Sequence, residues 1–337
     1  MSVSDIPLRA GSDPRAQRLA FAVMVVVLLL APLVVYPVFM MKVMCFALFA
    51  CAFNLLIGFG GLLSFGHAMF LGSGGYAAAH AAKIWGLTPE LAILFGTTVA
   101  VLLGAVVGLL AIRRQGIYFA MITLALAQMV YFFALQAPFT GGEDGIQAVP
   151  RGRLLGLIDL SQPMAMYGLV MAIFLGGFVL VWRVVHSPFG QVLKAIRENE
   201  PRAVSLGYDV DRYKLLAFVL STAFAGLAGS MKVLAVGFAT LTDAHWSQSG
   251  EVILMTLLGG LGTFAGPVIG AFTIIGLQNF LADRVGSWIG VIIGVIFVVC
   301  VVAFRRGFVG ELLAWQKRRA AAPANYTGRS TSKTEER

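Results

Sequence analysis

Charged residues are scarce in this sequence: Asp, Glu, Lys and Arg make up 12% of its 337 residues, whereas 59% are hydrophobic. This composition excludes an ordinary soluble domain, and several apolar runs are long enough to cross a lipid bilayer. The formal net charge is +9, but we expect no nucleic-acid partner, because cytoplasmic Lys and Arg give membrane proteins such an excess. The composition therefore predicts a polytopic membrane protein.

Residues that would bind metals or nucleotides, or carry out catalysis, are also missing. The three cysteines, Cys45, Cys51 and Cys300, lie in apolar runs without the spacing of a metal site. The sequence contains no G-x4-G-K-[ST] string, no nucleophile elbow and no His-Glu-x2-His pair. We therefore expect no metal, no cofactor and no enzymatic activity, and any ATP that powers the protein must bind another subunit.

Ten apolar segments are candidate membrane spans and predict an all-α membrane domain. The eighth is shorter than the roughly 20 residues of a regular span, so it forms a half-helix or continues brokenly into the ninth, which would reduce the count to nine. The ten segments are 19–36, 38–57, 63–82, 90–112, 117–137, 163–183, 215–236, 249–260, 264–282 and 286–304.

The distribution of basic residues predicts the orientation of these spans. With the N-terminus in the cytoplasm, 19 of the 25 Lys and Arg residues lie in cytoplasmic segments, and the C-terminus is cytoplasmic too. The predicted parts are an N-terminal segment 1–18, a membrane domain 19–310 with a cytoplasmic loop 184–214 and an outer loop 138–162, and a partly disordered tail 311–337.

A weak internal similarity joins two segments predicted on opposite sides of the membrane, as expected for two inverted halves of five spans each. A shift of 179 residues aligns Leu55, Gly58, Phe59 and Leu62 with Leu234, Gly237, Phe238 and Leu241.

Two glycine-rich stretches interrupt the predicted helices. The first follows the second span, and the second contains Pro267, which removes a backbone donor. Each stretch can allow close helix packing, or form a discontinuous helix whose freed backbone groups line a polar passage. The candidate residues along such a passage are Gly60, Gly61, Ser64, Phe65, Gly66, His67, Gln128, Gly259, Gly260 and Gly262.

The polar residues inside or near the spans also have ordinary structural explanations. His67 beside glycines can be a packed, hydrogen-bonded residue, and Gln128 can bond to another helix. Near the outer end of the seventh and eighth spans, ionisable groups either snorkel to the surface or line the cavity; these are Lys232, Asp243, His245 and Glu251. We expect Lys232 to snorkel to the surface and Glu251 to favour a helix dipole.

The outer loop 138–162 begins with an acidic turn whose glycines are expected to adopt positive φ. This element can be a simple turn, or it can dock a soluble binding protein or cap the pathway. The residues concerned are Thr140, Gly141, Gly142, Asp144 and Gly145.

The segment 186–214, HSPFGQVLKAIRENEPRAVSLGYDVDRYK, is a charged island between two apolar runs. Helical spacing places Leu193, Ile196 and Arg197 together on a short amphipathic helix, with Lys194 and the glutamates that follow on the wetter side. Such an element is either an ordinary solvated loop or a surface that a partner protein binds.

Five strings of this sequence resemble, in the same order, the branched-chain amino-acid (LivM/LivH) permease family of ATP-binding-cassette importers. The similarity covers about residues 38–310, and the strings are GLLSFGHAMF, QGIYFAMITLALAQM, TGGEDGIQAVP, SPFGQVLKAIRENEPRAVSLGYDVDRYKLLAFVLSTAFAGLAGS and MTLLGGLGTFAGPVIGAF.

This resemblance implies the permease fold of type II importers in a bacterial cytoplasmic (inner) membrane. The implied partners of a LivM-like subunit, besides lipid, are a homologous LivH-like permease subunit, two ATPase subunits and a periplasmic or extracellular substrate-binding protein. The implied coupling residues, which dock into the ATPase, are Phe189, Gly190, Leu193, Lys194, Ala195, Ile196, Arg197, Glu198, Asn199, Glu200 and Ala203.

The resemblance also implies a branched-chain or other hydrophobic amino acid as the small-molecule substrate, although urea and short-amide permeases look similar. An ATPase-independent carrier or channel is the alternative from another class. Such a protein would need ionisable residues deep within its spans, for example as a proton relay.

Overall fold

The structure of the protein is a computed structural model that describes residues 14–285, 290–292, 294–295 and 298. Most of the predicted tenth span, 286–304, and the predicted tail, 311–337, lie outside these residues. Within the described part, helices dominate and confirm the helical prediction. The exceptions are β1 (Arg153–Leu154) and β2 (Ile158–Asp159), which pair as a short antiparallel hairpin.

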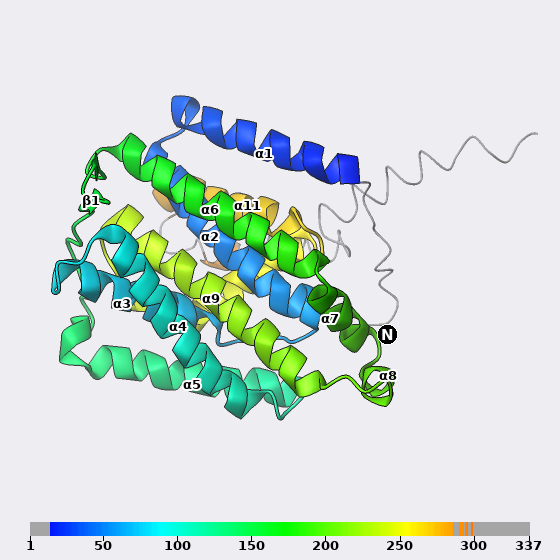
Figure 1. The fold of residues 1–337 in the computed structure, drawn as a ribbon. Helices are drawn as coiled ribbons and strands as arrows, with labels where there is room; N and C mark the ends of the chain where they lie inside the picture. The colour runs from blue at the N-terminus through cyan, green and yellow to red at the C-terminus, as the bar shows by residue number, and fades with distance from the viewer. Residues whose placement is uncertain (1–13, 286–289, 293, 296–297, 299–337) are drawn as a thin grey trace, which may run out of the picture.

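The long helices form a bundle with two distinct ends (Figure 1). We call them the hairpin end, which carries β1 and β2, and the α7 end. The helices in chain order are α1 (Pro14–Val34), α2 (Pro37–Asn54), the π-helix η2 (Leu55–Phe59), α3 (His67–Lys83), α4 (Pro89–Ala111), α5 (Ile117–Gln136), the 3-10 turn η3 (Pro138–Thr140), α6 (Pro163–His186), α7 (Pro188–Glu198), α8 (Glu200–Ser205), α9 (Val210–Val236), the 3-10 turn η4 (Leu241–Asp243), α10 (Trp246–Gly259) and α11 (Gly266–Val285).

Proline residues fix where several of these helices begin. A proline occupies the first turn of α2, α4, α6 and α7, where its missing N–H removes no intrahelical bond. Pro267 has the same position in α11, which begins at Gly266. The predicted break after the eighth span is therefore present, and α10 and α11 are separate helices.

Five helical segments of the described part are long and apolar enough to cross a membrane: Pro37–Phe59, Pro89–Ala111, Ile117–Gln136, Pro163–His186 and Val210–Val236. Phe21–Val34 and Gly266–Leu281 are shorter apolar helical segments. The predicted count of about ten is not confirmed, because α3 has 17 residues, α10 has 14, and the last predicted span lies mostly outside the described residues.

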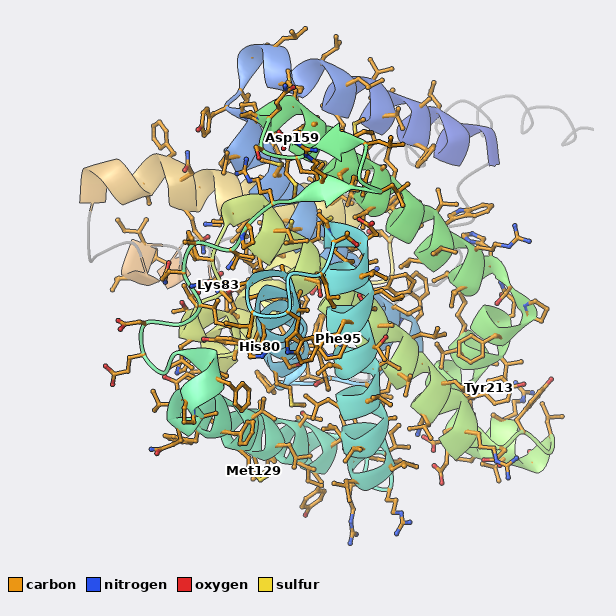
Figure 2. The ribbon with its side chains drawn as sticks, turned by 60° about the vertical axis from the view of Figure 1, so that its left-hand side comes forward. His80, Lys83, Phe95, Met129, Asp159 and Tyr213 are labelled. Carbon is orange, nitrogen blue, oxygen red and sulfur yellow. The ribbon has the colours of Figure 1, made fainter. Side chains whose placement is uncertain are left out.

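The core of the bundle consists of α2 and α9. In α2 with η2, 89% of the apolar span is buried, compared with 28% in α5. α2 packs against α6, α9, α10 and α11, and α9 packs against α3 and α4. By contrast, α5 presents an apolar side to its surroundings, where Met129 points away from the bundle (Figure 2). We expect this side to contact lipid or another subunit.

Glycines allow α3, α4 and α9 to approach closely. A methyl group at Gly74 would lie 2.8 Å from the Cα atom of Gly226, and one at Gly104 would lie 2.1 Å from the Thr222 Oγ1 atom. At Gly229 it would lie 2.0 Å from the carbonyl oxygen of Leu71. The close-packing explanation therefore applies to the glycines within these helices.

The loop between α5 and α6 is built into the hairpin end. Ile146 and Ala239 exchange two backbone hydrogen bonds, and the Arg151 Nη2 atom donates to the carbonyl of Ala235 at 2.9 Å. The ammonium group of Lys83 on α3 donates to the carbonyl of Gln147 at 2.7 Å (Figure 2). The loop is thus attached to both α3 and the chain that leaves α9.

The contact at Gly229 predicts that Gly229→Ala destabilises the bundle, because the added methyl group would force α3 and α9 apart. Overpacking of this kind costs roughly 1–3 kcal/mol. The measurement is thermal unfolding of the purified protein in detergent. Gly176→Ala is the matched control, since a methyl group there meets no atom within 4 Å. Equal melting temperatures for the two variants would contradict this packing.

Candidate functional site

The charged segment forms two short helices at the α7 end. The Ser187 hydroxyl caps α7 by accepting a hydrogen bond from the backbone N–H of Gly190. Asn199 then leaves the helical conformation, with φ −156°, and its Oδ1 atom accepts from the N–H of Arg202 to cap α8. Gly207, with φ +86°, follows the end of α8. The predicted amphipathic helix is present, but it is divided at Asn199.

The inward face of α7 lies against η2, which follows α2, and against α9. Leu193 and Ile196 are buried, as predicted. The Arg197 guanidinium donates from Nη1 to the carbonyl oxygen of Gly58 in η2, and burial lowers the pKa of this group. Lys194 was predicted on the solvated side, but its ammonium lies 5.5 Å from the centre of the Phe59 ring. Its aliphatic stem can cover the apolar surface there.

Asn54, the last residue of α2, joins the two helix breaks. Its Nδ2 atom donates to the carbonyl of Thr263 at 2.9 Å, and its Oδ1 atom accepts from the N–H of Gly262 at 3.0 Å. Gly260 and Gly262 have φ +114° and +70°, so the chain after α10 can turn toward this amide. We call residues 54 and 58–61, together with 260–263, the break junction.

The break junction depends on close backbone approach. A methyl group at Gly58 would lie 2.8 Å from the backbone nitrogen of Gly262, and one at Gly61 would lie 3.0 Å from the Cγ atom of Arg197. A methyl group at Gly60 would lie 3.8 Å from the Cδ1 atom of Leu193. Three elements far apart in the sequence, η2, α7 and the α10–α11 connection, therefore meet at one place.

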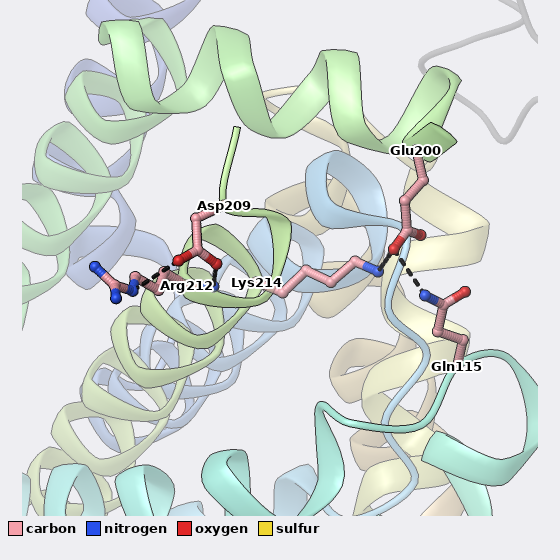
Figure 3. A network of polar contacts seen from close by, with 5 residues as sticks. All are labelled: Gln115, Glu200, Asp209, Arg212 and Lys214. Atoms are coloured by element: carbon pink, nitrogen blue, oxygen red, sulfur yellow. Dashed lines mark hydrogen bonds and ion pairs between the residues drawn. The ribbon is translucent and has the colours of Figure 1, made fainter. Parts of the chain in front are cut away.

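Glu200 joins the charged segment to α9 and to the α4–α5 connection (Figure 3). Its Oε1 atom accepts from the Lys214 Nζ atom of α9 and from the Gln115 Nε2 atom of the α4–α5 connection, both at 2.7 Å. The Phe189 and Tyr213 rings stack with their centres 5.6 Å apart. These contacts hold α7 and α8 against α9 and leave Ala195, Glu198 and Asn199 exposed.

Similarity to known proteins assigns the chain to a family. Residues 37–302 match the family model described as branched-chain amino acid transport system / permease component. The chain belongs to this family.

Several curated relatives of this permease transport different solutes, according to their names. It is 27% identical to the high-affinity branched-chain amino acid transport system permease protein LivM of Escherichia coli (71% of this chain, 62% of the relative). It is also 27% identical to the ribose import permease protein RbsC of Bacillus subtilis (68% and 76%) and to the autoinducer 2 import system permease protein LsrC of an Enterobacter species (60% and 59%). No solved structure matches the permease.

His67 of the permease is enclosed at the start of α3. Its ring has no exposed surface and lies among Phe49, Phe53, Phe70 and Phe218. The Ser221 hydroxyl donates to the carbonyl of Ala52 at 2.5 Å, so the His67 Nε2 atom, 2.7 Å from this oxygen, must be the donor. The Nδ1 atom is buried without a hydrogen-bond partner in the described part of the chain.

The other predicted pathway residues fall into two groups. Gly60, Gly61, Gly259, Gly260 and Gly262 lie in or beside the break junction, whereas Ser64, Phe65 and Gly66 lead from it to His67. A methyl group at Gly66 would lie 2.3 Å from the carbonyl of Thr123 on α5. Gln128 lies further along α5, half-buried, and its amide makes no hydrogen bond to any described residue.

The predicted turn in the outer loop has mixed exposure. Gly141, Gly142 and Gly145 have positive φ, as predicted. Thr140 is buried, and its hydroxyl lies within hydrogen-bond distance of the carbonyls of Ala134 and Ala137 at the end of α5. Glu143 and Asp144 are exposed and form the free acidic part of the turn.

The snorkelling prediction for Lys232 is wrong. Its side chain is 9% exposed, and its ammonium pairs with the Asp243 carboxylate of η4, which is equally buried. The sequence contains a partial signal, because Lys232 and Asp243 are ionisable groups near the same end of the predicted spans. The role of Asn54 was not predicted. Its position was a usable signal, because it is an amide within an apolar run just before a glycine-rich break.

The two hydrogen bonds of Asn54 predict that Asn54→Ala lowers stability, because it leaves the N–H of Gly262 and the carbonyl of Thr263 without partners. We expect a loss of roughly 1–3 kcal/mol in the free energy of unfolding, measured by thermal unfolding in detergent. Thr98→Ala is the control, because the exposed Thr98 hydroxyl bonds only within its own helix. A variant as stable as this control would show that Asn54 does not hold the breaks together.

Proposed function

We propose that the permease is the membrane subunit of an ATP-binding-cassette importer and that α7 and α8 couple it to separate ATPase subunits. The bond from Arg197 to the carbonyl of Gly58 carries this proposal. It connects the exposed amphipathic helix directly to a break in a buried membrane span. A solvated loop without a partner would not need such an attachment.

The proposal assigns the two faces of α7 different roles. The exposed residues Ala195, Glu198 and Asn199 contact the ATPase, whereas Leu193 and Arg197 transmit its motion to the break junction. Because Asn54 bonds both sides of the junction, displacement of α7 would move the end of α2 and the start of α11 together. Two rigid arrangements of these elements would open the pathway alternately to each side of the membrane.

The α7 end faces the cytoplasm in this proposal, since the basic residues of the sequence concentrate in the segments assigned there. The hairpin end then faces outward, and its exposed acidic turn at Glu143 and Asp144 contacts a substrate-binding protein. The exposed apolar side of α5 contacts lipid or a homologous, LivH-like permease subunit. This chain forms a heterodimer with that subunit.

The proposed solute is a branched-chain or other hydrophobic amino acid. The similarity to LivM supports it, whereas the relatives named for ribose and autoinducer 2 show that the same architecture is associated with other solutes. Urea or a short amide is the alternative within the importer class. An ATPase-independent carrier is disfavoured by the match to a permease component and by the attachment of α7 to the break junction.

The two faces of α7 predict different phenotypes for two variants. Glu198→Lys reverses an exposed charge and should abolish retention of the ATPase subunit during purification. Arg197→Ala removes an inward contact, so the ATPase subunit should remain bound while ATP-driven import falls at least tenfold. The measurements are copurification and solute uptake in proteoliposomes.

Arg114→Ala serves as the control for both variants, because Arg114 is an exposed basic residue in the α4–α5 connection. It should retain both the ATPase subunit and import. Uptake that continues unchanged after the ATPase subunits are removed would refute the importer and favour a carrier.

A further inference from the structure

A cluster of ionisable side chains lies toward the hairpin end of the membrane domain. It contains the Lys232 and Asp243 pair, with Lys42 on α2 and Glu251 on α10 nearby. The ammonium of Lys232 also lies 5.9 Å from the centre of the Phe46 ring on α2. Lys232 and Asp243 neutralise each other and fix η4 to α9, so this pair has a structural role.

Lys42 and Glu251 form no such direct pair. Neither side chain forms a hydrogen bond or an ion pair with another residue of the described part of the chain, and both are half-buried. Each belongs to the second turn of its helix. Because α2 and α10 pack against each other and converge at the break junction, these turns lie at a similar level. Glu251 and Asp243 attract Lys42, and Lys232 repels it.

Two neutral polar groups, one near Asp243 and one near Glu251, are also unsatisfied. Tyr76 on α3 is 6% exposed, and its hydroxyl is buried without a hydrogen-bond partner in the described residues. Tyr76 follows Gly72 by one helical turn, and Gly72 is in close contact with Ala244 directly after η4. The Oε1 atom of Gln248, one turn before Glu251, is likewise buried and unpartnered.

Lys42 and Glu251 attract each other but form no direct ion pair or hydrogen bond in the described part of the chain, and half-buried charges without direct partners are costly in a membrane domain. A solute that carries both charges would bridge them and give each a direct ionic partner. A sugar, urea or an amide would give neither an ionic partner, and a purely anionic or cationic solute would pair with only one of them.

We propose that Lys42, Glu251 and Tyr76 form a recognition site for a zwitterionic solute in the outer part of the pathway. The solute carboxylate pairs with the Lys42 ammonium and accepts a hydrogen bond from the Tyr76 hydroxyl, while the solute ammonium pairs with the Glu251 carboxylate. The inference rests on the proposed importer function and specifies its substrate class. Selection here would add to any selection by the binding protein.

The test is uptake of radiolabelled L-leucine and, separately, of ribose by proteoliposomes that contain the full complex and the binding protein for each solute. Lys42→Met and Glu251→Gln should each reduce ATP-driven leucine import at least tenfold, and Lys42→Arg should restore most of it. Lys83→Met is the control, because Lys83 is another outer lysine whose partner is a loop carbonyl. Copurification of the ATPase subunit should be unchanged in every variant, which separates recognition from coupling.

Leucine import that stays within twofold of the unmodified protein in both Lys42→Met and Glu251→Gln would overturn the site. ATP-driven import of ribose but not of leucine by the unmodified complex would also overturn it, while the importer function would stand. If the unmodified complex imports neither solute in an ATP-dependent manner, the proposed function fails, and this inference fails with it.

Discussion

The structure depends on how two interrupted helices satisfy their freed backbone groups inside a membrane. Unpaired N–H and C=O groups are costly where water is excluded, so irregular backbone must find protein partners. Asn54 provides both a donor and an acceptor for the α10–α11 connection, and Arg197 provides a donor for η2. One side chain therefore joins the two breaks to each other, and the second joins them to α7. These few polar contacts explain why an exposed amphipathic helix and a buried membrane region form one structural unit.

α2 extends this unit across the bundle. The helix ends at Asn54 beside α7, and its second turn carries Lys42 toward the hairpin end. Because most of this span is buried and it packs against α6, α9, α10 and α11, its two ends are expected to move together. In the proposed importer, a displacement that begins at α7 would thus reach the outer recognition residues through one continuous element. The close glycine contacts among α3, α4 and α9 provide a compact group of helices against which α2 can move.

Much of this arrangement follows from sequence patterns, and the remainder depends on long-range contacts. Helical periodicity and glycine content predicted the amphipathic segment at 186–214 and both breaks, because these signals are local. The partners of Arg197 and Asn54 could not be predicted, since Gly58 and Thr263 lie 139 and 209 residues away in the chain. Lys232 was misinterpreted for the same reason: its position near a helix end is typical of snorkelling, and only the fold brings Asp243 to it. The division of the segment at Asn199 follows from its capping role toward α8, which residue spacing alone does not determine.

The most direct measurement replaces the Arg197 contact with a reversible covalent bond. A β-carbon at Gly61 would lie 3.7 Å from that of Arg197, which is within the range for a disulfide of about 3.5–4.5 Å. Arg197→Cys with Gly61→Cys, in a protein without its native cysteines, is assayed for ATP-driven import under reducing and oxidising conditions, alongside each single variant. If the attachment of α7 to the break junction transmits motion, import is low when the pair is reduced and recovers when it is oxidised. Full import by the reduced pair, or no recovery after complete oxidation, would contradict the account.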